Sequence, residues 1–223
     1  MHAEPRPAWY ALARGGWRDY VTLLHPPYTL WHLSYVAVGA GLAPTLSWTR
    51  LAAALVAFAL AMGIGAHALD ELNGRPLGTA IPDATLWTLV AASVAAAVAI
   101  GVYASVEWTG WLLPFVVAGA FVVAAYNLEL FGGAFHTDLW FGLAWGALPL
   151  LAAYVVETGT LRAEALVAAG WATLLSLAQR ALSRPVRDAR RRQARVEAGL
   201  ETALRLLTAA TVALAVALLV RRL

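Results

Sequence analysis

The chain has 223 residues, of which 61% are hydrophobic and only 13% are charged, and its mean hydropathy is +0.68. Soluble domains carry about 25% charged residues, so this composition excludes an ordinary soluble domain and indicates a protein of the lipid bilayer. The sequence has no cysteine, which excludes disulfide bonds and thiolate chemistry. The net charge of +3 includes sixteen basic residues, all of them arginine. Their uneven distribution between loops is typical of a membrane protein and argues against nucleic acid as a partner.

Stretches without Asp, Glu, Lys or Arg mark the predicted membrane-spanning helices. Five of them provide roughly the 20 apolar residues that cross the hydrocarbon layer; they are 20–49, 51–69, 84–106, 108–128 and 139–156. Two shorter stretches, 165–179 and 206–220, are flanked by arginines, whose side chains can reach the lipid headgroups from within the hydrocarbon. The sequence therefore predicts an all-α fold, an integral membrane helical bundle of about seven transmembrane helices.

Two local patterns refine this expectation. Residues 51–69 are apolar on every side instead of alternating between apolar and polar, which excludes a transmembrane β-barrel. Gly142 and Gly146 are four residues apart, and such a pair of small residues predicts that the helix across 139–156 packs closely on a neighbour.

The charged segments divide the chain into four parts. We expect residues 1–27 to form a cytoplasmic N-terminal interfacial segment and residues 28–183 to form a six-helix membrane bundle. Residues 184–196 are expected to be an arginine-rich cytoplasmic loop, and residues 197–223 a C-terminal transmembrane helix. With seven spans, eleven arginines fall on the N-terminal side of the membrane and four on the other. Because basic residues concentrate in cytoplasmic loops, the N-terminus is expected in the cytoplasm and the protein in the cell inner membrane.

The first group of candidate functional residues lies where the predicted second helix ends, in residues 63–79. His67, Asp70 and Glu71 are spaced three and four residues apart, so they lie on adjoining parts of one helical face. Such a group can hold a divalent cation, with oxygen ligands suiting Mg²⁺ and a histidine beside carboxylates suiting iron, manganese or zinc. The alternative is that the carboxylates are solvated at a helix end and that His67 is hydrogen-bonded to a neighbouring helix.

Two further groups are predicted on the same side of the membrane. The end of the fourth predicted helix and the loop after it contribute Tyr126, Asn127, Glu129, His136 and Asp138. The end of the sixth contributes Gln179, Arg180, Ser183, Arg184 and Asp188. The run 184–195 is interpreted first as a positive-inside determinant that contacts anionic lipid, and alternatively as a clamp for a diphosphate. Convergence of three polar groups at one mouth of a helix bundle predicts a pocket for an amphiphile, with its tail between the helices.

In four segments the sequence resembles the UbiA superfamily of intramembrane prenyltransferases. Residues 25–44 resemble the opening span of that family, and HALDELNGRPLGT at 67–79 is similar in position to its first aspartate-rich motif. Residues 115–161 resemble its fourth helix, tyrosine-containing loop and glycine-rich fifth helix. The sixth predicted helix and the arginine-rich segment stand where its second aspartate-rich motif belongs. The resemblance covers most of residues 25–190.

The chain departs from the family in its carboxylates and its helix count. The first family motif is Asn-Asp-x-x-Asp with a further Asp four residues on, and here Asp70, Glu71, Gly74 and Gly78 occupy those positions in order. In the second motif region only Asp188 remains. The family has nine helices, against about seven predicted here.

The resemblance implies a fold, a reaction and a set of site residues. The fold would be UbiA-like, and the reaction would move an isoprenoid from its diphosphate to an aromatic or lipid acceptor. Mg²⁺ would be bound by Asp70, Glu71 and His67, while Glu71 and Tyr126 would be catalytic, with Tyr126 beside the developing allyl cation. The remaining residues implied at the substrate are Arg75, Asn127, Arg180, Arg184 and Asp188.

Two other functions remain open at this stage. A diverged member of the superfamily would keep the bundle and bind an isoprenoid, quinone or carotenoid-like lipid, or a membrane partner, without catalysis. A different metal-dependent membrane enzyme would use His67 and Glu71, with His32 and His136, as ligands of iron or zinc. Of the five histidines, His2 and His25 are expected to be peripheral.

Overall fold

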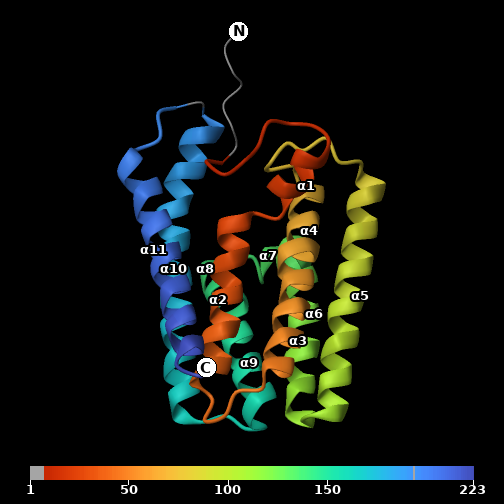
Figure 1. The fold of residues 1–223 in the computed structure, drawn as a ribbon. Helices are drawn as coiled ribbons and strands as arrows, with labels where there is room; N and C mark the ends of the chain where they lie inside the picture. Colours follow the sequence, from red (N-terminus) through yellow and green to blue (C-terminus); the bar gives the residue numbers. More distant parts are fainter. Residues whose placement is uncertain (1–7, 193) are drawn as a thin grey trace.

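The computed structural model describes residues 8–192 and 194–223, and within them every regular element is a helix (Figure 1). This confirms the predicted all-α class. In chain order the short helix α1 (Trp17–Leu23) precedes α2 (Pro26–Leu42), and a continuous helix follows, made of α3 (Trp48–Phe58), the π-helical η1 (Ala59–Ala66) and α4 (His67–Leu72). Next come α5 (Asp83–Glu107), the 3₁₀ turn η2 (Gly110–Leu112) and α6 (Leu113–Asn127).

The second half of the chain repeats this pattern of long helices joined by short turns. The short α7 (Leu130–Gly133) leads to a continuous helix made of α8 (Asp138–Gly142), the π-helical η3 (Leu143–Ala147) and α9 (Leu148–Thr158). The two last helices are α10 (Ala163–Arg191) and α11 (Ala198–Val220).

Six helices of the described residues are long and apolar enough to cross a membrane. They are Trp48–Leu72, Asp83–Glu107, Gly110–Asn127, Asp138–Thr158, Ala163–Arg191 and Ala198–Val220. The molecule is thus a helical bundle of the kind found in multi-pass membrane proteins. The predicted span 20–49 is not among these six. It corresponds to α2, which has 17 residues and is shorter than each of them.

Helix α2 lies in the middle of the bundle, between α10 and α11 on one side and α3, α5 and α6 on the other (Figure 1). It approaches α9 so closely that a Cβ atom on Gly39 would lie 2.1 Å from the carbonyl oxygen of Leu150. The buried Trp31 donates its indole N–H to the hydroxyl of Tyr35 at 2.6 Å, and the hydroxyls of Tyr35 and Ser176 lie 3.2 Å apart. These buried polar groups find partners within the protein, as hydrocarbon surroundings require.

The predicted close packing at Gly142 and Gly146 is confirmed. A Cβ atom on Gly146 would lie 2.6 Å from the carbonyl oxygen of Ala172, and one on Gly142 would lie 3.0 Å from Cγ2 of Thr173. Both contacts are with α10. The small residues therefore bring the segment that carries Asp138 directly against the helix that carries the arginines.

The arginine-rich segment 184–196, expected as a loop, is helical over most of its length. Helix α10 continues through Pro185 to Arg191, and only the following residues connect it to α11. Side-chain contacts with other elements hold this extension, since Arg184 binds Asp138 and Arg190 forms an ion pair with Glu201 of α11. As a result the side chains of Arg180, Arg184 and Arg187 project from successive turns of one helix.

One end of the bundle, which we call the α1 end, holds α1, the loop between α4 and α5, and the connection between α10 and α11 (Figure 1). The C-terminus lies at the opposite end, where Arg222 donates hydrogen bonds to the carbonyl oxygens of Gly41, Ala43 and Pro44. Arg14, Arg18 and Arg75 lie at the α1 end, whereas Arg6 falls outside the described residues.

Candidate functional site

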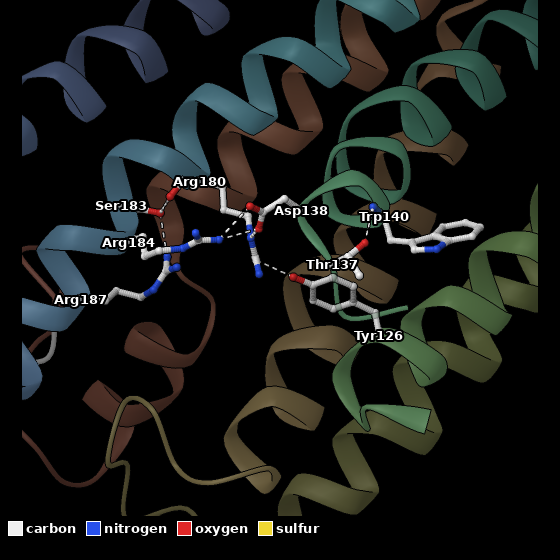
Figure 2. A network of polar contacts seen from close by, with 8 residues as sticks. All are labelled: Tyr126, Thr137, Asp138, Trp140, Arg180, Ser183, Arg184 and Arg187. Atoms are coloured by element: carbon white, nitrogen blue, oxygen red, sulfur yellow. Dashed lines mark hydrogen bonds and ion pairs between the residues drawn. The ribbon is translucent and has the colours of Figure 1, made fainter. Parts of the chain in front are cut away.

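Two arginines of α10 converge on one carboxylate near the α1 end (Figure 2). Arg180 donates from Nε to Oδ1 of Asp138 at 2.5 Å, and Arg184 donates to both oxygens of the same carboxylate at 2.7 and 2.8 Å. The other arm of Arg180 donates to the hydroxyl of Tyr126 at 2.6 Å. The side chain of Arg180 is 16% exposed, while those of Arg184 and Asp138 are 54% and 50% exposed. We call these four residues the arginine cluster.

Aromatic rings enclose the tyrosine of this cluster. Tyr126 is 5% exposed, and the ring of His136 stacks on it with centroids 4.4 Å apart. The ring of Trp145 lies 4.6 Å from that of Tyr126, and the guanidinium of Arg180 lies 5.0 Å from the ring centroid of Phe141. The faces of these rings carry negative partial charge, so the surroundings of Tyr126 stabilise a cation.

Two further polar groups adjoin the arginine cluster. Arg187, one turn beyond Arg184, is exposed and donates to the hydroxyl of Ser183 at 2.7 Å. Asp70 at the end of α4 is partly exposed and interacts electrostatically with His136 and Arg187. Among the described residues, the Asp70 carboxylate receives no hydrogen bond. It is therefore free to accept a hydrogen bond or a proton from a ligand.

Glu71, next to Asp70, has a different environment. It is 0% exposed, and its two carboxylate oxygens accept the backbone N–H groups of Leu77 at 3.0 Å and Thr79 at 2.7 Å. The carboxylate thus organises the loop that follows α4. Asp19 of α1 assists by accepting the N–H of Ala80 at 2.7 Å. Glu71 thus uses both oxygens on the backbone of the loop, while Asp19 uses one there and accepts the N–H of Gly15 with the other at 2.8 Å. The sequence did not predict these contacts.

Arg75 belongs to the same loop and not to the arginine cluster. It donates to the carbonyl oxygens of Thr79 at 3.1 Å and Ile81 at 2.7 Å, and it forms an ion pair with Asp83 at the start of α5. Arg75 also has a positive φ of 51°, a conformation that costs a non-glycine residue energy. Its guanidinium therefore stabilises the tight course of the loop.

His25, predicted to be peripheral, is partly buried and contacts residues of two other segments. It accepts or donates a hydrogen bond of 2.5 Å with the hydroxyl of Tyr10, and its ring stacks on that of His67 with centroids 4.2 Å apart. Burial, together with nearby His67 and Arg187, lowers the pKa of His25 well below 6.5, so this imidazole is neutral at pH 7. The sequence did not indicate the contact with Tyr10, because the two residues are distant in sequence.

The proposed metal ligands are not brought together. His67 uses Nδ1 on the carbonyl oxygen of Gly63 at 3.1 Å, and His32 uses Nδ1 on the carbonyl oxygen of Trp145 at 2.9 Å. With Glu71 bound to the loop backbone, the part of the chain that the structure describes contains no group of three His, Asp or Glu side chains arranged to hold a metal ion.

Asn127 and Asp188, the last two residues implied at the substrate, differ in their contacts. Asn127 is buried, donates to the carbonyl oxygen of Val123 at 2.7 Å, and accepts through its own carbonyl the side chain of Asn73 at 3.1 Å. It therefore joins α4 to α6 beside Tyr126. Asp188 is partly exposed and its carboxylate makes no hydrogen bond or ion pair with the described residues.

An apolar cavity of about 100 Å³ lies between α3, α5, α6 and α9, deeper in the bundle than the arginine cluster. Its wall on α6 includes Val123, one turn before Tyr126, and its wall on α5 extends from Val94 to Trp108 at the opposite end. That stretch of helix is about 20 Å long, or roughly two thirds of the hydrocarbon thickness of a membrane. Small residues, among them Ala97, leave this space open.

Comparisons with protein-family models, curated proteins and solved structures give no match for this chain. The function is accordingly inferred from the residues of the site itself. Of the residues singled out in the sequence, the structure gathers Tyr126, Asp138, Arg180 and Arg184 in direct contact and places Asp70 nearby. It assigns Glu71 and Arg75 to the loop after α4.

The role of Glu71 in the loop leads to a stability prediction. Glu71→Ala leaves two buried N–H groups without acceptors, which lowers the free energy of unfolding by about 3 kcal/mol. Asp70→Asn is the matched control, because the adjacent Asp70 receives no hydrogen bond from the described residues, and its stability stays within about 0.5 kcal/mol of the parent. Unfolding in detergent, followed by circular dichroism, measures both. Equal stability of the two variants contradicts the assignment of Glu71 to the loop.

Proposed function

We propose that the protein is a UbiA-like membrane prenyltransferase that moves an isoprenoid from its diphosphate to an aromatic or lipid acceptor. The observation that carries this proposal is the arginine cluster, where two guanidinium groups converge beside an aromatic-lined tyrosine. Guanidinium groups bind phosphate oxygens through paired, charge-assisted hydrogen bonds. A binding site for an anionic headgroup and a surface that stabilises a cation thus lie side by side.

The diphosphate would be held by Arg180 and Arg184, with Arg187 available from the next turn of α10. The allylic carbon would then lie near Tyr126 and the surrounding rings, and the hydrocarbon tail would extend toward the apolar cavity. The one-turn separation between Tyr126 and Val123 on α6 supports this arrangement, because it places the wall of the cavity just below the head-binding residues.

The reaction breaks the bond between the allylic carbon and the diphosphate oxygen. The diphosphate leaves with the electron pair, and the arginines stabilise its charge, while the rings around Tyr126 stabilise the allyl cation. The acceptor forms the new bond to that carbon and loses a proton. Asp70 is suited to receive the proton, because its carboxylate accepts no hydrogen bond from the described residues.

Of Asp70, Glu71 and Asp138, only Asp70 has oxygens without a hydrogen bond from the described residues, so fewer ligands are left for a carboxylate-bound Mg²⁺ than the resemblance implies. Such a site takes at least one or two carboxylates in addition to the substrate phosphates. Here both oxygens of Glu71 are bound to backbone N–H groups, and the carboxylate of Asp138 is bound to arginines. We therefore derive no step through Mg²⁺ and assign the neutralisation of the diphosphate to Arg180 and Arg184.

A second function, binding of an isoprenoid or quinone lipid without catalysis, is favoured by one specific observation. Glu71, which fills a carboxylate position of the superfamily motif, is used to organise a loop. A diverged member would keep the arginine cluster and the cavity and lose turnover. A single measurement distinguishes the two functions, namely whether bound prenyl diphosphate is consumed when an acceptor is added.

We also propose that α2 is a seventh span, with the N-terminus in the cytoplasm and the bundle in the inner membrane. Two observations support this. Helix α2 lies within the bundle between longer apolar helices, and the arginines of α1, of the loop after α4 and of the end of α10 all lie at the α1 end (Figure 1). Clustered arginines mark the cytoplasmic side.

Single cysteines test this topology, because the natural chain has none. Leu24→Cys and Pro76→Cys at the α1 end are expected to react with a membrane-impermeant maleimide in inside-out vesicles. Pro44→Cys and Gly110→Cys at the opposite end are expected to react in right-side-out vesicles. Labelling of positions 24 and 44 from the same side contradicts a crossing by α2, and the reverse labelling pattern contradicts the orientation.

Substitution of the arginines tests the proposed function. Arg180→Ala and Arg184→Ala are each expected to weaken binding of farnesyl diphosphate by about tenfold or more, since each removes a charge-assisted pair of hydrogen bonds. Arg221→Ala, an exposed arginine at the opposite end, is the control and keeps parental affinity. Calorimetry on purified protein measures binding, and a labelled prenyl group with a panel of aromatic and quinone-precursor acceptors measures turnover.

The outcomes separate the two functions. Binding and turnover support the transferase, whereas binding without turnover for every acceptor supports the non-catalytic lipid-binding protein. Parental affinity in both arginine variants overturns the assignment of the arginine cluster as the diphosphate site.

A substitution in the cavity tests where the hydrocarbon tail lies. Ala97→Phe fills the cavity and is expected to weaken binding of farnesyl diphosphate, with little effect on inorganic pyrophosphate, which has no tail. Ala96→Phe is the matched control, because the adjacent Ala96 is exposed on the outer face of α5. The ratio of the two affinities in each variant is the measurement. An unchanged ratio in Ala97→Phe shows that the tail lies elsewhere.

A further inference from the structure

The carboxylate of Asp138 occupies the position that the proposed function gives to a phosphate group. Both of its oxygens accept hydrogen bonds from Arg184, and Oδ1 also accepts one from Arg180 (Figure 2). A carboxylate and a phosphate present similar oxygen pairs to guanidinium groups. An incoming anionic headgroup therefore has to displace Asp138 before it binds both arginines.

The backbone holds Asp138 in this position independently of the arginines. Asp138 is the first residue of α8, and Thr137 caps that helix by accepting the N–H of Trp140 at 3.3 Å. The helix start thus does not use the Asp138 side chain, which remains free to leave the arginines. The carboxylate is 50% exposed and its partner Arg184 is 54% exposed, so water can hydrate both groups when the contact opens. The contact is therefore exchangeable.

Arg180 keeps its position when the carboxylate leaves. Its other arm donates to the hydroxyl of Tyr126, and its guanidinium lies over the ring of Phe141. An incoming anion therefore meets a guanidinium that is already oriented.

Charge decides which headgroups can make the exchange. A phosphodiester, as in an ordinary phospholipid, carries one negative charge. It replaces the single charge of Asp138 and leaves that carboxylate unpaired beside it, so the exchange gains nothing. A terminal phosphate carries about −1.5 to −2 at neutral pH, and a diphosphate adds a further charge and further acceptor oxygens. It can bind both arginines and reach Arg187, and these additional contacts offset the loss of the ion pairs with Asp138.

We propose that Asp138 is an internal competitor for the arginine cluster, which keeps singly charged phosphodiester lipids from occupying it and is displaced by diphosphate esters. This inference rests on the proposed function, because it assumes that the arginine cluster binds the substrate headgroup. It adds the residue that the headgroup of that substrate displaces. The surrounding membrane is rich in phosphodiester lipids, so a site of arginines without such a competitor would be occupied by them.

The test compares two probes on the purified full-length protein and on Asp138→Asn. The probes are inorganic pyrophosphate and short-chain phosphatidylglycerol below its micellar concentration, and their affinities are measured by calorimetry. The parent is expected to bind pyrophosphate and to bind phosphatidylglycerol poorly. Asp138→Asn is expected to bind both probes more tightly, phosphatidylglycerol by about tenfold, because neither probe then has to displace a carboxylate.

Asp83→Asn is the matched control. It makes the same chemical change at the same end of the bundle, in a carboxylate that is paired with Arg75 outside the arginine cluster. It is expected to keep the parental affinity for both probes. Circular dichroism establishes that both variants retain the helical fold.

The outcomes distinguish the inference from the proposed function. If the parent binds pyrophosphate and Asp138→Asn binds phosphatidylglycerol no more tightly than the parent does, Asp138 is not the competitor, and the proposed site stands. Equal gains for phosphatidylglycerol in Asp83→Asn and Asp138→Asn mean that net charge alone is responsible, and this also overturns the inference. If neither the parent nor Asp138→Asn binds pyrophosphate, the proposed function and the inference both fail.

Discussion

Hydrocarbon offers no hydrogen-bond partner, and this constraint governs every polar group in the bundle. A carboxylate or guanidinium inside such a protein must be paired by another part of the chain or be accessible from an aqueous end. The polar residues of this chain follow that rule in two ways. Some complete the backbone hydrogen bonds of a loop, and others bind one another at the α1 end, where a ligand can reach them.

The loop after α4 illustrates the first way. Glu71 and Asp19 accept its backbone N–H groups, and Arg75 donates to its carbonyl groups. These residues use their hydrogen-bonding capacity on the chain itself, so they have little left for a metal or a phosphate. The arginine cluster illustrates the second way, since Arg184 and Asp138 are half exposed and their ion pair can be exchanged for that of a ligand.

This division bears on the chemistry that the protein can support. In the superfamily that the sequence resembles, carboxylates bind the diphosphate through Mg²⁺, whereas here the groups around Tyr126 are predominantly cationic. Guanidinium groups contact phosphate oxygens directly and need no bridging ion. The proposed function keeps the reaction class implied by the resemblance and changes the means by which the leaving group is stabilised.

The sequence by itself determined the all-α class, the long apolar helices and the asymmetric arginines, because these depend on local composition and on the length of charge-free stretches. It also indicated Tyr126, Asp138 and Arg180, since they lie at helix ends on one predicted side. Only the tertiary structure decided that Glu71 binds backbone N–H groups, that Tyr10 contacts His25, and that α10 continues through the arginine-rich segment. Each of these depends on a partner that folding brings from elsewhere in the chain, and the spacing of residues along the sequence does not specify which partner that is.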